Sequence, residues 1–146
     1  MWVTAYCDAS FGRDRAGGWA VWLRSSAGRL TRQGPCPPWV KDSVSAELAA
    51  IFAAVHLSVA TWSAGVQGVL VCSDCQPALE LAAVQRIASA GAARRLEERL
   101  RSLTDKHGLS LRTRWVKGHR PASAGTAAYL NDWCDRSARA ARRAKR

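Results

Sequence analysis

Acidic residues are scarce in this sequence. Its 146 residues include 11 Asp and Glu against 22 Lys and Arg, which gives a formal net charge of +11 at pH 7. This imbalance disfavours a cationic partner and favours a polyanion, because each phosphate contact releases condensed counterions. Nucleic acid is therefore the expected partner.

Long apolar runs and an even set of cysteines are also missing. No apolar stretch of membrane-spanning length and no basic amphipathic helix stands out, so we expect no membrane partner. Five cysteines are an odd number, and the sequence shows no secretory signal, which argues against a disulfide framework and favours a cytoplasmic location. Cys72 and Cys75 have CxxC spacing, but a zinc site needs two further ligands, so we interpret them as core thiols.

No internal repeat, linker or second domain is visible, and the 48% hydrophobic content suffices for one core. We expect a single domain over residues 1–146 with a short basic C-terminal tail. The patterns predict strands over 2–7, 19–23, 29–33, 69–72 and 109–116, and helices over 46–62, 77–87, 92–106 and 127–144. The first three strands suit an antiparallel meander, and Ser43 or Ser45 can cap the first helix.

Four acidic residues lie where these elements would bring them together. Asp8 ends the first predicted strand, Asp74 ends the fourth, Glu47 lies in the first turn of the first long helix, and Asp135 lies in the last helix. Ligand sites in α/β sheets form beyond the carboxyl ends of parallel strands, so Asp8 and Asp74 would be neighbours if their strands pair in parallel. Carboxylate oxygens clustered without His or Cys are suited to Mg²⁺ or Mn²⁺.

Each acid, taken singly, has an equally good structural interpretation. Asp8 and Asp74 can cap turns, and the helix dipole favours a glutamate at position 47. Asp135 can pair with Arg139 four residues further along the helix. The acids alone therefore leave the function open.

The segments around the acids resemble the four motifs of type 1 ribonuclease H, in their usual order and over nearly the whole chain. They are YCDAS with Asp8, SAELAAI with Glu47, CSDCQ with Asp74, and WVKGH followed by NDWCDRSARAA with Asp135. Four ordered matches are far more specific than any single acid. The resemblance implies an α/β ribonuclease H-like fold, a five-stranded mixed sheet in order 3-2-1-4-5 with its second strand antiparallel, flanked by helices.

The resemblance also implies a metal-dependent endonuclease that hydrolyses the RNA strand of RNA/DNA hybrids and leaves 3′-hydroxyl and 5′-phosphate ends. Two Mg²⁺ ions, for which Mn²⁺ can substitute, would be held by the expected catalytic residues Asp8, Glu47, Asp74 and Asp135. His119 matches the family's loop histidine and is expected to move protons or to help product leave. The expected partner is the hybrid, and we expect a monomer.

Further motif positions are expected to contact the substrate, namely Ser10, Ser43, Gln76, Lys117 and Asn131. The chain departs from the family pattern in three places. Ser43, Val44 and Ser45 stand where the family has its polar residues just before the helix glutamate. The segment between Asp74 and Trp115 is too short for the basic handle of some members, although four arginines in the third predicted helix offer a smaller basic face. The loop after His119 is longer than in the best-known bacterial members.

Several alternatives remain at this point. Asp132 competes with Asp135, because residues three apart share a helix face; the family-like order around Asp135 favours the latter. A DNA-directed nuclease of the same fold and a non-catalytic hybrid-binding module are the rival functions. Among the seven tryptophans, only Trp39 is expected at the surface, and we expect His56 to lie in the core.

Overall fold

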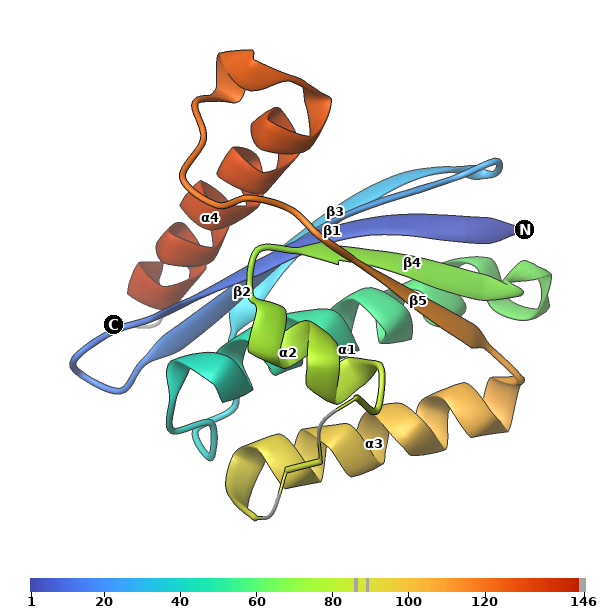
Figure 1. Ribbon diagram of the computed structural model, residues 1–146, viewed down its shortest axis with the longest axis horizontal. Helices are drawn as coiled ribbons and strands as arrows, with labels where there is room; N and C mark the ends of the chain where they lie inside the picture. Colours follow the sequence, from blue (N-terminus) through green and yellow to red (C-terminus); the bar gives the residue numbers. More distant parts are fainter. Residues whose placement is uncertain (86, 89, 145–146) are drawn as a thin grey trace.

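The computed structural model describes residues 1–85, 87–88 and 90–144, and these form a five-stranded sheet with helices on both faces (Figure 1). The order is β3-β2-β1-β4-β5; β2 is antiparallel to β1 and β3, and β1, β4 and β5 are parallel. This is the order expected from the sequence. The strands are β1 Trp2–Phe11, β2 Gly17–Ser25, β3 Gly28–Pro35, β4 Gly68–Ser73 and β5 Ser110–Trp115. The α-helices are α1 Ser43–Trp62, α2 Gln76–Ala82, α3 Gly91–His107 and α4 Thr126–Ala144.

Successive residues of β1 point to opposite faces of the sheet, as the period of a strand requires. Val3, Ala5 and Cys7 face α1 and are almost completely buried, in the larger part of the core. Tyr6 packs on the other face with Leu130 and other residues of α4. Figure 1 shows α1 and α4 on opposite sides of the sheet, with α3 beyond α1.

The segment Ser43–Gly65, which contains α1, is long and apolar enough to cross a membrane by length and composition alone. The expectation that no such run exists was therefore wrong. Half of the most apolar 18-residue stretch of this segment is buried inside the protein, and α1 packs against β1 and β2. Packing against the sheet explains the apolar composition of the buried half, because a helix face inside a core needs no polar surface.

Two element boundaries differ by four residues or more from the sequence-based expectation. β1 continues past Asp8 to Phe11, because Ser10 and Phe11 pair with Gly18 and Gly17 of β2. Asp8 therefore lies inside a strand, not at its end. α2 ends at Ala82 instead of near residue 87, and Val84 then adopts a positive φ of 63° that no helix accommodates.

The helix cap and several side chains also differ from expectation. Asp42, and neither expected serine, caps α1 by accepting a hydrogen bond from the Ser45 amide over 2.8 Å. Trp2 and Trp115 are exposed, so Trp39 is not the one tryptophan at the surface. His56 is exposed and stacks on Phe52 instead of lying in the core. Among the described residues, which include all five cysteines, no disulfide forms, and all the cysteines except the half-buried Cys75 are buried, as expected of core cysteines.

Gly18 of β2 lies directly against the backbone of α4. A Cβ atom added there would collide with the backbone carbonyl oxygen of Ala138 and the backbone nitrogen of Arg142. Since helix backbone cannot move aside locally, the missing side chain sets how closely α4 packs on the sheet. α4 also carries several expected site residues, so this contact positions them.

We predict that Gly18→Ala destabilises the protein by about 1–3 kcal/mol, because α4 must be displaced to admit one methyl group. Thermal unfolding followed by circular dichroism should show a midpoint lower by roughly 3–9 °C. Gly65→Ala is the matched control: its added Cβ meets the flexible end of Met1 at 3.2 Å. Equal midpoints for both variants would contradict the close packing of α4.

Candidate metal centre

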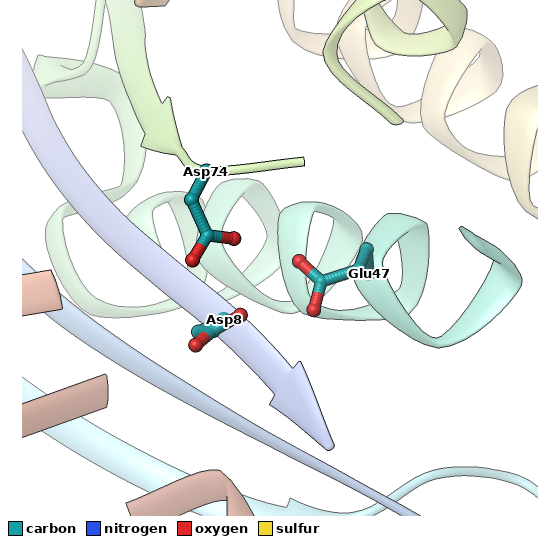
Figure 2. A group of neighbouring side chains, drawn as sticks. All are labelled: Asp8, Glu47 and Asp74. Atoms are coloured by element: carbon teal, nitrogen blue, oxygen red, sulfur yellow. The ribbon is translucent and has the colours of Figure 1, made fainter. Parts of the chain in front are cut away.

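Three carboxylates from distant parts of the sequence meet at one edge of the sheet. One ligand oxygen each from Asp8, Glu47 and Asp74 lies within 4.8 Å of the other two. Figure 2 shows them converging from β1, from α1 and from the segment that follows β4. The parallel pairing of β1 with β4 brings the two aspartates together, and the Asp42 cap fixes the start of the helix that carries the glutamate.

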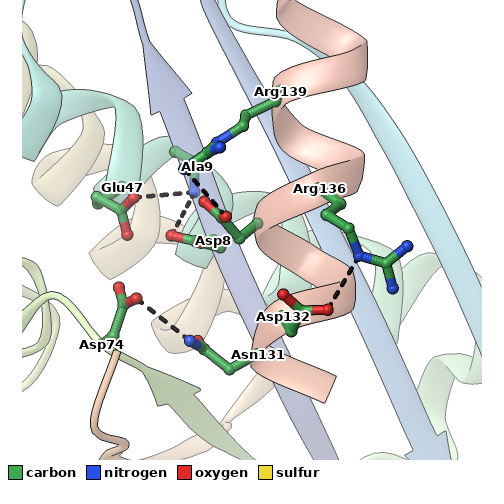
Figure 3. Close-up of polar contacts among 9 residues, drawn as sticks. Asp8, Ala9, Glu47, Asp74, Asn131, Asp132, Arg136 and Arg139 are labelled. Carbon is green, nitrogen blue, oxygen red and sulfur yellow. Dashed lines mark hydrogen bonds and ion pairs between the residues drawn. The ribbon is translucent and has the colours of Figure 1, made fainter. Parts of the chain in front are cut away.

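Backbone and side-chain donors hold these acids in place. The Ala9 amide donates to Asp8 Oδ1 and to Glu47 Oε1, each over 2.9 Å, so that one N–H joins the strand acid to the helix acid (Figure 3). Asn131 of α4 donates from Nδ2 to Asp74 Oδ2 over 3.3 Å. Gly118 lies beside Asp74: a Cβ there would come within 2.8 Å of Oδ2, so a larger residue would press on this carboxylate.

The acids are buried far enough to change their proton affinity. The pKa of Asp8 is raised to about 7, chiefly by burial; hydrogen bonding with Glu47 opposes the shift, and the nearby charge of Asp74 contributes to it. Burial, followed by the charge of Asp8, raises the pKa of Glu47 well above its usual range. Holding these two groups ionised side by side therefore costs free energy in the metal-free protein.

The cluster fits a hard divalent cation. Among the described residues no donor reaches Glu47 Oε2, although this oxygen is buried. A buried acceptor without a partner is unfavourable unless a cation satisfies it. The ligands are oxygens alone, the set that Mg²⁺ and Mn²⁺ prefer. Asp8, Glu47 and Asp74 could thus hold such an ion, whose charge would reverse the repulsion between them.

Asp135 lies next to this group but outside it. Its Oδ2 pairs with Arg139 Nη2 at 3.3 Å. Asp132 pairs with Arg136 at 3.0 Å (Figure 3), so each acid has a partner one helical turn further on. Both aspartates line a cleft of about 380 Å³ together with Asp74. Their placement in the cleft therefore does not by itself decide which of Asp132 and Asp135 is the fourth metal ligand.

The other expected site residues are spread around this cleft and the surrounding surface. His119 and Asn131 line the cleft; His119 is exposed and Asn131 is buried. Ser43, Gln76 and Lys117 are exposed, and Ser10 is half-buried in β1. Asn131 was expected to contact substrate, but its amide donates to Asp74. The Ala9 amide and Gly118 were missed, since backbone donors and close approaches leave no mark in a side-chain pattern.

No protein-family model and no curated protein matches this chain. Solved structures do match it at low identity. The N-terminal ribonuclease H domain of Rv2228c from Mycobacterium tuberculosis has a TM-score of 0.77 at 16% identity, with 99% of this chain and 95% of that chain covered. RNase H1 from the archaeon Halobacterium salinarum has a TM-score of 0.74 at 18% identity, with 97% of both chains covered.

A third neighbour is LC11-RNase H1, solved in complex with an RNA/DNA hybrid, with a TM-score of 0.76 at 11% identity and 98% of both chains covered. The structural neighbours are thus type 1 ribonucleases H over nearly the full length of the chain. The chain has the ribonuclease H-like fold, with an acidic Asp8, Glu47 and Asp74 cluster that could bind metal.

The raised pKa of Asp8 predicts how the metal-free protein responds to pH. Its folded-state pKa lies above the unfolded value near 3.9, so the folded state binds more protons between about pH 4 and pH 7. Stability from this group is therefore present at low pH and lost as pH rises through 7. In EDTA at pH 7.5, Asp8→Asn should raise the unfolding free energy by on the order of 2 kcal/mol.

Thermal unfolding in EDTA at pH 5 and pH 7.5 measures this effect. From pH 5 to pH 7.5 the unfolding midpoint of Asp8→Asn should fall by less than that of the unmodified protein. Asp105→Asn, at an exposed position of α3, should behave like the unmodified protein. A destabilised Asp8→Asn protein at pH 7.5 would show that the buried acids do not repel one another.

Proposed function

We propose that this protein hydrolyses the RNA strand of RNA/DNA hybrids, using two divalent cations, Mg²⁺ or Mn²⁺, and leaving 3′-hydroxyl and 5′-phosphate ends. The observation that carries the proposal is the group of three carboxylates within 4.8 Å, in a ribonuclease H-like fold. A related fold in LC11-RNase H1 was solved with such a hybrid, and the +11 charge suits a polyanionic substrate.

Asp8, Glu47 and Asp74 would hold the cations, and Asp135 would reach them from α4. Bound cations would lower the pKa of a water molecule and stabilise the charge on the leaving 3′ oxygen. Asn131 keeps the Asp74 carboxylate oriented through its 3.3 Å hydrogen bond. The Ala9 amide keeps Asp8 and Glu47 at a fixed separation, so little reorganisation is needed when a cation binds.

His119 lines the same cleft as Asp74 and Asp135 and is exposed, so it could take up or release a proton as product leaves. Its φ of 58° belongs to the left-handed region, which a non-glycine residue rarely adopts, so the loop conformation is specific. The exposed polar side chains of Ser43, Gln76 and Lys117, together with Ser10, are proposed to contact the hybrid. Contacts to 2′-hydroxyls would distinguish its RNA strand from DNA.

We predict that Asp74→Asn abolishes cleavage of labelled hybrid in Mg²⁺, because it removes one charged ligand and leaves the surrounding packing intact. Duplex DNA and duplex RNA of the same sequence should be cut far more slowly than hybrid by the unmodified protein. Asp105→Asn serves as the control and should retain activity. Faster cleavage of duplex DNA would instead favour a DNA-directed nuclease, and hybrid binding without cleavage in either metal would favour a binding module.

A second experiment distinguishes the two acids of α4. Asp135→Asn should reduce the cleavage rate at least tenfold more than Asp132→Asn, because the family-like motif aligns Asp135 with the fourth metal ligand. His119→Ala should lower turnover without abolishing it, since metal-bound water remains available. Rates are compared at matched Mg²⁺ concentration. An inactive Asp132→Asn beside an active Asp135→Asn would reverse the assignment.

A further inference from the structure

The face of the sheet that carries α4 is only partly covered. In Figure 1, α4 crosses the end of the sheet where β1 finishes, and among the described residues no helix lies over the end where β1 begins. The strand register places two rows of side chains on this open part, since paired residues share a face. From β3 to β5, one row is Arg29, Arg24, Thr4, Leu70 and Arg112, and the next is Thr31, Trp22, Tyr6, Cys72 and Arg114.

Aromatic rings occupy the middle of this surface and surround a hollow of about 550 Å³. Tyr6 and Trp22 meet edge to face, with ring centroids 6.0 Å apart. Trp2 is 37% exposed and extends over Gly68 of β4, where a side chain would occupy the position of the indole. A face that served only packing would not leave two indoles beside an open hollow.

Arginines lie on both sides of the rings. The guanidinium of Arg112 lies 4.9 Å from the Trp2 ring centroid, and Arg24 lines the hollow. Arg24, Arg29 and Arg112 are exposed, and within the described part of the chain no ion pair joins them to a carboxylate. Of the residues that the structure describes, no acidic one lines the hollow. No described carboxylate therefore neutralises these cations, and Arg112 also contacts the Trp2 ring.

We propose that this surface, which we call the arginine–indole surface (Trp2, Trp22, Arg24, Arg29 and Arg112), binds single-stranded nucleic acid. Unpaired bases would stack on the two indoles, and the backbone phosphates would contact the arginines. Base stacking requires an exposed ring face on each base, which a duplex does not offer, whereas alternating rings and cations match the bases and phosphates of a single strand.

The surface is distinct from the acid cluster but lies on the same side of the sheet. Trp2 and Asp8 point to one face of β1 and are six residues apart, or about 20 Å along the strand. α4 separates the two sites: Leu130 lines the hollow, and the next residue, Asn131, lines the acidic cleft. The surface is thus placed to hold an unpaired extension of a nucleic acid whose paired part lies at the acids.

Fluorescence anisotropy of a labelled twelve-nucleotide oligo(dT), measured in EDTA, tests the proposal without metal and without cleavage. Replacing Arg24, Arg29 and Arg112 together by Gln should weaken binding at least tenfold. The slope of log affinity against log salt should fall by about 2, at roughly 0.7 per lost phosphate contact on a single strand. The matched control replaces three exposed cations elsewhere, Arg32, Lys106 and Arg143, by Gln and should bind much more tightly than the first triple variant.

Stacking is tested separately at Trp2. Trp2→Leu should weaken oligo(dT) binding about tenfold. Trp2→Phe should retain most of the affinity of the unmodified protein, because Phe keeps a ring on which a base can stack. A purely structural role for Trp2 would instead change the unfolding midpoint without this retention of affinity in Trp2→Phe.

Three results would overturn the proposal: equal weakening by the two triple variants, no effect of Trp2→Leu, or competition by poly-glutamate as effective as competition by unlabelled oligo(dT). Because the assay contains no divalent metal, a negative result leaves the proposed hydrolysis intact. Conversely, an enzyme inactive on hybrid could still bind single strands at this surface.

Discussion

The contact between Asp8 and Glu47 is the constraint on which the rest of this structure depends. Two carboxyls share one backbone N–H, that of Ala9, and burial raises the pKa of both. Such a pair is unfavourable in a metal-free protein and persists only where surrounding packing determines it. The buried faces of β1 and α1 supply that packing, because Val3, Ala5 and Cys7 interlock with the helix that carries Glu47.

The remaining parts of the site follow from how α4 lies on the opposite face. Gly18 allows the helix to approach the sheet closely, and this approach brings Asn131 to Asp74. The same helix leaves part of the face uncovered, where three arginines and the indole of Trp2 are exposed. One helix therefore separates an acidic cleft from a basic aromatic surface, and the protein's large positive charge is not spread evenly around its acids.

The sheet order was implied by the resemblance to type 1 ribonuclease H. The convergence of Asp8, Glu47 and Asp74 was expected from their places at strand ends and a helix start, which leave clear local patterns. Sequence reasoning placed Asp8 at a strand end, since pairing of Ser10 with Gly18 is a tertiary event that no local pattern reports. The role of Asn131 as a donor to Asp74, and the row of arginines across five strands, depend on register and helix packing. These become visible only when distant segments are brought together.

Direct titration with Mn²⁺, followed by the loss of the free-ion signal in electron paramagnetic resonance, tests the central claim most closely. The account predicts saturable binding at pH 7.5 by the unmodified protein and at least tenfold weaker binding by Glu47→Gln, which keeps the shape of the side chain and removes its charge. Equal Mn²⁺ affinity of the two proteins would mean that the buried acids are not a metal site, and would contradict the account.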